Sequence, residues 1–170
     1  SSGSLPAPLP ASVPTGEVKY NDQTHTLEFT SVALNSLYAM DTELMVGISR
    51  EIGLVAEGDR WQRRYDDLKR LMNEKLWSEE DGLYLDRHWD GRFSRRVSLE
   101  SFYPLLAGIP DEAKAKRMLA VLRDPRKFGG LQLLPSIARD DPDFVERASE
   151  QSAASVATGA THAAMNYLLY

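Results

Sequence analysis

The sequence predicts a mainly α-helical domain built from antiparallel helix pairs, with one small β-hairpin. Two amphipathic stretches between residues 30 and 76 follow one another with only a short link, as in paired helices. Asp90-Gly91 lies between alternating residues, and this dipeptide favours the positive φ values of a tight hairpin turn. A third amphipathic stretch begins after Pro110. These observations set the fold class.

Composition narrows the class of protein. The chain has 170 residues, 42% of them hydrophobic, which is enough for one domain with a real core. A net charge of -5 argues against nucleic acid or an anionic membrane as a partner. The absence of cysteine excludes disulfides and thiolate metal sites. No apolar run approaches the roughly 18 residues of a membrane span, and no signal peptide opens the chain, so we expect a cytoplasmic or recombinant soluble protein.

The first residues divide into a tail and the start of the domain. Residues 1–16 are rich in serine and proline, which predicts an extended tail or strap, and residues 17–170 are expected to form one helical domain. A proline-motif ligand is the less favoured alternative, because no basic residue flanks the prolines. Residues 18–29 combine turn residues with a short alternating stretch, in which His25 is expected to be structural.

The first helix is expected to begin at Thr30 or Ser31 and to end at Gly53. Its apolar residues recur in three- and four-residue steps and predict a buried face made of Leu34, Leu37, Tyr38, Met45, Ile48 and Ile52. Asn35 and Asp41 lie on the same helix. Either could point into a polar concavity, although exposure is the expected state of both.

A second helix is expected from about Asp59 to Leu76. Its buried stripe is predicted to contain Trp61, Tyr65, Leu68, Leu71, Met72 and Leu76. The opposite face carries mixed charge, typical of a solvated surface, in Arg60, Arg63, Arg64, Asp66, Asp67, Lys69 and Arg70. The short link makes the two helices antiparallel neighbours.

After Trp77 the spacing of the hydrophobic residues changes from a helical to an alternating pattern. The alternation from Leu83 to Phe93 predicts the β-hairpin, with His88 on its surface. Residues 101–108 predict a short buried helix with Pro104 in its first turn. Asp111 is a helix cap, and Asp124-Pro125 ends the helix that follows. We expect the inward residues of that helix to be Ala115, Met118, Leu119 and Leu122.

Five runs of residues together resemble a known family. They are 73–77, 81–84, Phe-Tyr-Pro-Leu-Leu-Ala-Gly-Ile at 102–109, 124–130, and Leu-Pro-Ser-Ile-Ala-Arg-Asp-Asp-Pro at 134–142. This succession is similar to the catalytic domain of family 63 glycoside hydrolases, which includes processing α-glucosidase I and mannosylglycerate hydrolases. The resemblance implies an (α/α)6 toroid with sugar bound in its central funnel. The length of the chain predicts only a partial toroid.

The same resemblance implies that the family's chemistry has been lost. Inverting glycosidases use two carboxyl groups roughly 6.5 to 9.5 Å apart. The position of the first is matched here to Pro10, and the second is expected beyond Tyr170. His162 stands where the family has tryptophan, within a run of small residues, and residues 98–101 differ from the family pattern. We therefore predict no catalytic residue, no cofactor and no metal. The predicted ligand-binding remnant of the funnel is Asn35, Asp41, Glu100, Tyr103, His162 and Asn166.

Two classes of function follow. The first is a non-catalytic scaffold or binding module, an engineered and resurfaced fragment of a glycoside hydrolase, with a natural pseudoenzyme as the other origin. The alternative is a glycoside hydrolase or carbohydrate-binding protein that uses Asp86, Glu100 or Asp140. A zinc site of His25, His88 and His162 is less favoured because the histidines lack ligand spacing. Expected partners are a carbohydrate or small molecule and a second copy at the open toroid edge, without nucleic acid or membrane.

Overall fold

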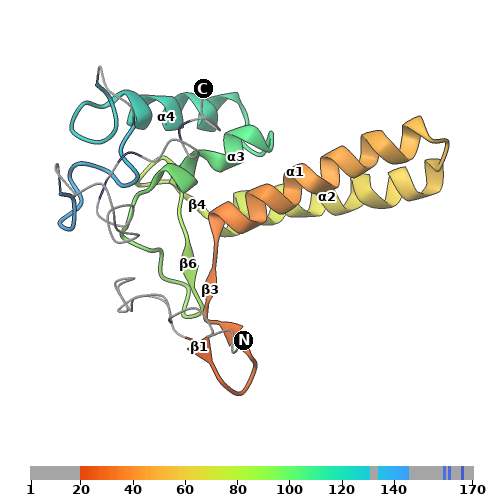
Figure 1. Ribbon diagram of the computed structural model, residues 1–170, viewed down its shortest axis with the longest axis horizontal. Coiled ribbons are helices and arrows are strands. Elements are labelled where there is room, and N and C mark those ends of the chain that lie inside the picture. Colours follow the sequence, from red (N-terminus) through yellow and green to blue (C-terminus); the bar gives the residue numbers. More distant parts are fainter. Residues whose placement is uncertain (1–19, 131–133, 146–158, 160, 162–165, 167–170) are drawn as a thin grey trace, which may run out of the picture.

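A computed structural model describes residues 20–130, 134–145, 159, 161 and 166, and it shows a long helical arm projecting from a compact head (Figure 1). The arm consists of α1 (Val32–Glu51) and α2 (Val55–Lys75). The head consists of the described residues between 76 and 138, apart from the turn formed by residues 87–93. Its elements are β4 (Trp77–Ser78), β5 (Leu83–Tyr84), η1 (Leu99–Phe102), α3 (Tyr103–Leu106) and α4 (Glu112–Arg123). The short strands β1 (Tyr20–Asn21), β2 (Thr26–Leu27), β3 (Phe29–Thr30) and β6 (Arg87–His88) lie below the junction of arm and head.

The first helix begins where the sequence predicts. The Ser31 hydroxyl accepts a hydrogen bond from the Leu34 amide at 3.2 Å, and the chain leaves the helix through Gly53, which has a φ of 79°. The second helix begins four residues earlier than predicted, at Val55. Its interior Gly58 is buried, and a side chain there would meet Arg50 Cγ at 3.1 Å. Gly58 therefore allows α1 and α2 to lie close together.

The predicted buried face of α1 is wrong. The residues that face inward are Val32, Ser36, Ala39, Thr42, Val46 and Ser49. The predicted stripe is largely exposed, with 69% of Leu34, 54% of Ile48 and 65% of Ile52 accessible. Small side chains let α1 approach α2 closely, and the buried hydroxyls of Ser36 and Thr42 donate to carbonyls of their own helix at 2.7 Å. Periodicity finds an apolar stripe but does not say whether a partner covers it.

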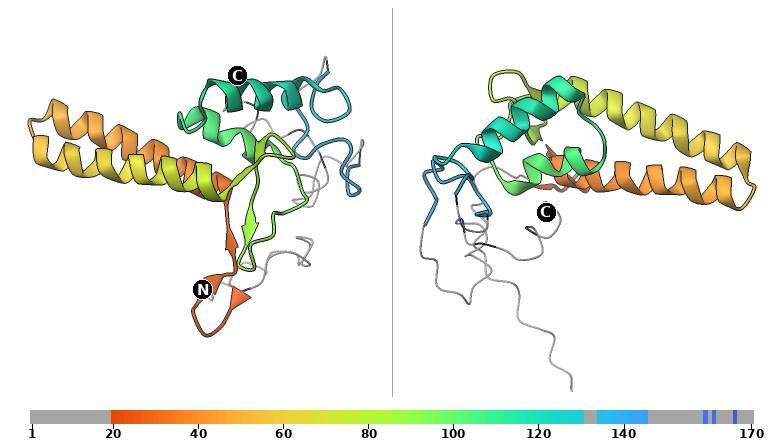
Figure 2. Two further views of the ribbon diagram at one scale, coloured as in Figure 1. Left: turned by 180° about the vertical axis from the view of Figure 1, so that it is seen from behind. Right: turned by 90° about the horizontal axis from the view of Figure 1, so that it is seen from above.

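The stripe of α2 is partly confirmed. Tyr65 and Met72 are buried, whereas Leu71 is exposed, because the head covers only one side of the helix. The Tyr65 hydroxyl donates to the Ala107 carbonyl at 2.8 Å and so ties the arm to the head. Figure 2 shows from two further directions that the remainder of the arm extends away from the head.

The strands differ from the single predicted hairpin. The Asp90-Gly91 turn is present, with the His88 amide donating to the Arg92 carbonyl at 2.9 Å. Yet Leu83 and Tyr84 pair with Ser78 and Trp77, in a separate hairpin that begins directly after α2. The remaining pairs are antiparallel, β6 with β3 and β1 with β2. Burial decides this register, because β4 and β5 place their side chains in the core.

The core fills the head and extends into the adjoining part of the arm, where Val32, Ala39, Tyr65 and Met72 join it. Its largest fully buried side chains include Tyr84, Phe102 and Phe128, and the two phenylalanine rings meet edge to face at 5.3 Å. Pro104 sits in the first turn of α3, as predicted, and the Asp111 carboxylate caps α4 by accepting from the Lys114 amide at 2.8 Å.

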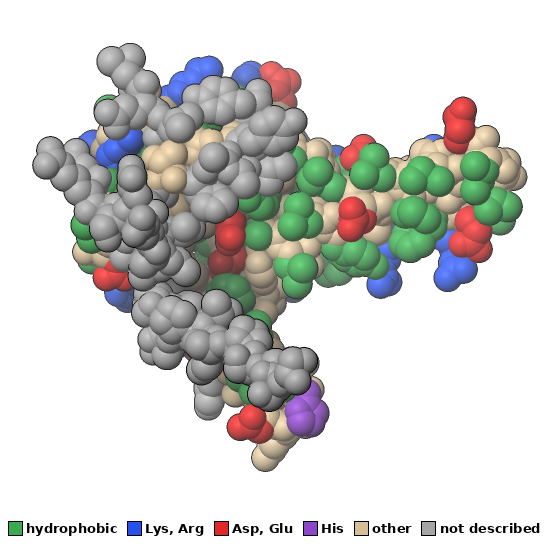
Figure 3. Space-filling view, viewed as in Figure 1, with side chains coloured by type: hydrophobic (Ala, Val, Ile, Leu, Met, Phe, Trp, Pro, Cys, Tyr) green, Lys and Arg blue, Asp and Glu red, His purple; other side chains and the backbone are tan. Residues whose placement is uncertain are grey.

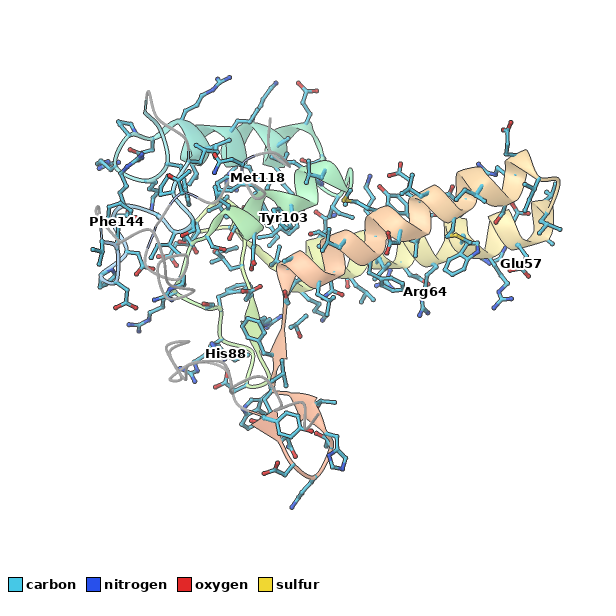
Figure 4. All side chains as sticks on the ribbon, in the orientation of Figure 1. Glu57, Arg64, His88, Tyr103, Met118 and Phe144 are labelled. Carbon is cyan, nitrogen blue, oxygen red and sulfur yellow. The ribbon has the colours of Figure 1, made fainter. Side chains whose placement is uncertain are left out.

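Met118 of α4 points into the head core, where Figure 4 labels it. Leu119 is 38% exposed, contrary to prediction, because α4 buries only a narrow stripe on the surface of the head. None of the helices among the described residues has the length and apolar character needed to cross a membrane. Residues 1–16 and the small-residue run around His162 lie almost wholly outside the described part.

Candidate functional site

Ionisable side chains gather where the start of the arm meets the head. Asp86 comes just before β6, Glu100 lies in η1, and Tyr103 begins α3. Helix α1 contacts both η1 and α3, which brings its first turn to the same place. Figure 3 shows acidic side chains at this junction, and Figure 4 labels Tyr103 beside it. We call Asp86, Glu100 and Tyr103 the junction cluster.

Asp86 is held by the helix it faces. One carboxylate oxygen accepts a hydrogen bond from the Val32 amide at 2.6 Å, at the positively polarised N-terminus of α1. The backbone carbonyl of Asp86 also accepts from the Ser94 amide at 2.7 Å. The first contact holds the carboxylate in place, and the second fixes the backbone that carries it. Asp86 therefore brings a negative charge to the cluster.

Glu100 is the perturbed acid of the cluster. Burial raises the pKa of its carboxyl above the ordinary value, and the negative charge of Asp86 raises that pKa further. Burial likewise raises the pKa of the Tyr103 hydroxyl, with a smaller contribution from the charge of Glu100. The cluster thus holds one fixed carboxylate, one carboxyl that retains its proton more readily, and a phenol that stays protonated. Groups of this kind can hydrogen-bond to sugar hydroxyls as donors and acceptors.

The structure separates the predicted ligand-binding residues. Glu100 and Tyr103 belong to the junction cluster, and Asn35 lies in the first turns of α1, where its amide donates to the Ser31 carbonyl at 2.7 Å. Asp41 lies midway along the arm in a different groove. Asn166 is buried, and it accepts from the Leu134 amide at 2.9 Å and donates to the Leu134 carbonyl at 3.0 Å. His162 is outside the described residues. Whether these residues bind a ligand stays a prediction.

Other ionisable residues lie apart from the cluster. Asp140, weighed above as an acid, pairs with Lys127 at 2.8 Å on the surface. His25 is exposed with a φ of 53° in the turn between β1 and β2, and His88 packs edge to face on Phe29. Over the ranges that the structure describes, no three histidine, aspartate or glutamate side chains gather as a metal site would require.

Sequence reasoning missed a groove on the arm. Tyr38 and Trp61 line two adjoining hollows between α1 and α2, and arginines of α2 surround the second hollow. The mixed charge of this part of α2 predicts a solvated helix face instead. The feature of the sequence that could have indicated the groove is the pair Tyr38 and Trp61. Each of these aromatic residues lies on its helix at the border between apolar and charged residues.

The sequence matches the family profile of the mannosylglycerate hydrolase MGH1-like glycoside hydrolase domain over residues 11–160. The chain belongs to this family. A protein of Borreliella burgdorferi described as uncharacterized is 26% identical over 125 residues, which is 74% of this chain and 25% of that protein. The cytosolic neutral trehalase of Kluyveromyces lactis is 29% identical over 129 residues, 65% of this chain and 17% of the trehalase.

Solved structures agree on the fold of this MGH1-like domain. The GH63 mannosylglycerate hydrolase of Thermus thermophilus, solved in complex with glucose, superposes with a TM-score of 0.67 at 18% identity. That match covers 83% of this chain and 31% of the hydrolase. A sialidase gives a TM-score of 0.73 at 18% identity, over 82% of this chain and 13% of its own.

Together the comparisons identify this MGH1-like chain as part of a GH63-like α/α toroid, and they confirm the predicted fold class. The chain spans a quarter or less of the two sequence relatives and under a third of the two solved structures. The profile begins one residue after Pro10, so the residue matched above to the missing acid lies just outside the matched range.

Proposed function

We propose that this part of a glycoside hydrolase toroid binds a carbohydrate at the junction cluster and does not hydrolyse glycosides by itself. The observation that carries the proposal is that Glu100, Tyr103 and Asp86 gather where α1 meets η1 and α3, with Asp86 held by the Val32 amide at 2.6 Å. The raised pKa of the Glu100 carboxyl supports it. These groups offer both donors and acceptors at one place. The family relationship supports a sugar as the ligand, since the T. thermophilus hydrolase was solved with glucose.

The non-catalytic half of the proposal rests on the position of Asp86. Inverting hydrolysis needs a proton donor on one side of the scissile bond and a free carboxylate on the other, at roughly 6.5 to 9.5 Å. Glu100 has the raised pKa of a donor, but the Asp86 carboxylate is engaged by the Val32 amide at the end of α1. We assign Asp86 to helix capping and to setting the charge of the cluster. It is not positioned as an independent base.

A titration with glucose and with mannosylglycerate, followed by calorimetry, tests the binding. Glu100→Ala removes a hydrogen-bonding group and is expected to weaken binding by about tenfold. Glu112→Ala is the matched control, because Glu112 lies exposed at the start of α4 and pairs with Lys116 of its own helix. Equal affinity of the parent chain and Glu100→Ala would contradict the junction cluster as the sugar site.

The second candidate is a hydrolase in which Glu100 donates the proton to the leaving oxygen. The raised pKa of Glu100 is the observation that favours it. Incubation with aryl α-glycosides separates the two candidates. We expect no release of aryl alcohol above buffer, and turnover abolished by Glu100→Gln would establish the hydrolase.

We also propose that the chain is a helical scaffold whose funnel residues were deliberately replaced. The support is the sequence pattern: matched framework residues alternate with small residues at the positions expected to face sugar, and His162 is among the replacements. A genome that encodes the same residues at these positions would contradict deliberate replacement and favour a natural pseudoenzyme.

A further inference from the structure

Three side chains of α2 hold one turn of the head. Tyr65, Lys69 and Asn73 follow one another at four-residue intervals, so they lie on the same face of the helix. The Tyr65 hydroxyl, the Lys69 ammonium and the Asn73 amide donate hydrogen bonds to the backbone carbonyls of residues 107, 108 and 109, at 2.8, 2.6 and 3.1 Å respectively. These carbonyls form the turn that directly follows α3. We call the three side chains the clasp.

The turn is shaped to receive the clasp. Gly108 has a φ of 61°, and a side chain on it would meet the Tyr65 hydroxyl oxygen at 3.1 Å. Its neighbours Ala107 and Ile109 are both 0% exposed. Carbonyls at the end of a helix have no partner within that helix, and a buried carbonyl without a partner costs free energy. The clasp supplies these partners, and polar contacts of this kind fit only one position of the turn against α2.

Asn73 also joins the clasp to other parts of the head. Its amide oxygen accepts hydrogen bonds from the Tyr84 hydroxyl at 2.8 Å and from the Lys114 ammonium at 2.6 Å. Tyr84 is fully buried in β5, and Lys114 lies near the start of α4. The Asn73 amide nitrogen donates to the Lys69 carbonyl as well, at 2.8 Å. Asn73 is thereby fixed from three elements, which restricts the place of the clasp itself.

The turn held by the clasp continues the helical segment that carries most of the junction cluster. Residues 99–106, which are η1 followed directly by α3, include Glu100 and Tyr103. The Ile109 amide donates to the Pro104 carbonyl at 3.0 Å and so couples the turn to this segment. Asp86, the third member of the cluster, is attached instead to the first turn of α1. The separation of Asp86 from the other two therefore depends on how the segment is held against the arm.

We propose that the clasp residues are positioning residues, which set the place of Glu100 and Tyr103 relative to Asp86. Their importance for carbohydrate binding rests on the function proposed above, whereas their effect on the geometry of the cluster does not. Among the described residues, the ionisable groups beside Glu100 are Asp86 and Tyr103, and the first turn of α1 contains no charged residue. The titration of Glu100 therefore reports its burial and its distance from Asp86.

The pH titration of Glu100, followed by carbon-13 NMR of its carboxyl group, tests the proposal. Tyr65→Phe removes one hydroxyl of the clasp without changing any charge, so the segment should shift and Glu100 should become more exposed. We expect the midpoint of its titration to fall toward the ordinary value of 4.5. Tyr38→Phe is the matched control, because the Tyr38 hydroxyl accepts from Arg64 at 3.0 Å within the arm. The control should titrate like the parent chain, and Glu100→Gln identifies the signal.

Lys69→Met provides a second variant at a half-buried position, where the fold tolerates the change. The midpoint of Glu100 should fall here too, although the loss of a cation alone would raise the pKa of a nearby carboxyl. Calorimetry with glucose adds a ligand readout. Lys69→Met should weaken binding by about threefold, and Lys69→Arg should restore it because arginine keeps a cationic donor.

The outcomes separate positioning from simple stabilisation. A clasp that only stabilised the fold would give variants with a lower unfolding temperature and an unchanged Glu100 midpoint, and that result would overturn the proposal. A parent chain that does not bind glucose, together with a midpoint that Tyr65→Phe lowers, would contradict the carbohydrate site and still support the clasp as the device that positions Glu100.

Discussion

The head and the arm use hydrophobic residues in opposite ways. In the head, large side chains such as Tyr84, Phe102 and Phe128 are fully buried and contact one another. In the arm, the interface between α1 and α2 consists largely of small residues such as Ala39 and Ser36, while the large side chains of α1 lie at the surface. The head is thus stabilised by a core of large side chains, whereas in the described part of the chain the large side chains of α1 lie mostly outside its contact with α2.

The largest effect is expected from the head. Phe102 is 0% exposed, and its ring packs on Phe128, so Phe102→Ala should leave a cavity and lower the free energy of unfolding by about 3–5 kcal/mol. Urea denaturation measures the change. Trp89→Ala is the control, because Trp89 is 75% exposed, and its effect should stay within about 0.5 kcal/mol. Similar losses in the two variants would contradict the placement of Phe102 in the packed core.

The interior of the arm should resist larger side chains. Ala39 is 0% exposed in α1, so Ala39→Leu should push the helices apart and cost about 1–3 kcal/mol of unfolding free energy. Thermal unfolding followed by circular dichroism reports the loss. Leu34→Ala, at a position on the same helix that is 69% exposed, provides the comparison and should change stability little. An unchanged or higher midpoint for Ala39→Leu would show that the interface is loosely packed.

The outer side of the arm should accept a methyl group. A side chain at Gly47 would meet nothing within 4 Å, and the residue lies inside α1. Gly47→Ala should therefore stabilise the chain by up to about 1 kcal/mol, because alanine loses less backbone entropy in a helix. Chemical denaturation shows whether the free energy of unfolding rises or falls. Gly53→Ala, where φ is 79°, should instead destabilise, and a gain at both sites would count against the backbone argument.

The smallest effect is expected at the junction, where pH reports on Glu100. Its folded pKa lies above the ordinary value of 4.5, so its contribution to stability is present below that value and is lost as pH rises through the folded pKa. Glu100→Gln removes the partly buried charge and should stabilise the chain at neutral pH. Screening by solvent keeps this gain below about 1 kcal/mol.

Unfolding curves for the parent chain and Glu100→Gln at several pH values check this shift. The advantage of the variant should shrink toward acidic pH, where the parent carboxyl is protonated. A variant that is less stable than the parent at neutral pH would show that the Glu100 carboxylate is favourably paired in the folded chain.

The sites could be predicted only in part. Glu100 and Tyr103 are three residues apart, so local sequence brought them together, and the matched family run at 102–109 contains Tyr103. The contact of Asp86 with Val32 joins residues separated by 54 positions, which no local pattern encodes. The groove with Tyr38 and Trp61 was missed because a charged helix face and an apolar helix face were interpreted separately.

The sequence alone determined the helices, their caps and the turns, because Ser31, Gly53, Pro104 and Asp111 act on the backbone within a few residues of themselves. It also determined the family, because the matched runs extend along most of the chain. Tertiary structure decided which face of α1 is covered and which strands pair. An apolar stripe lowers the free energy only when another surface excludes water from it, and spacing along one helix does not specify where that surface lies.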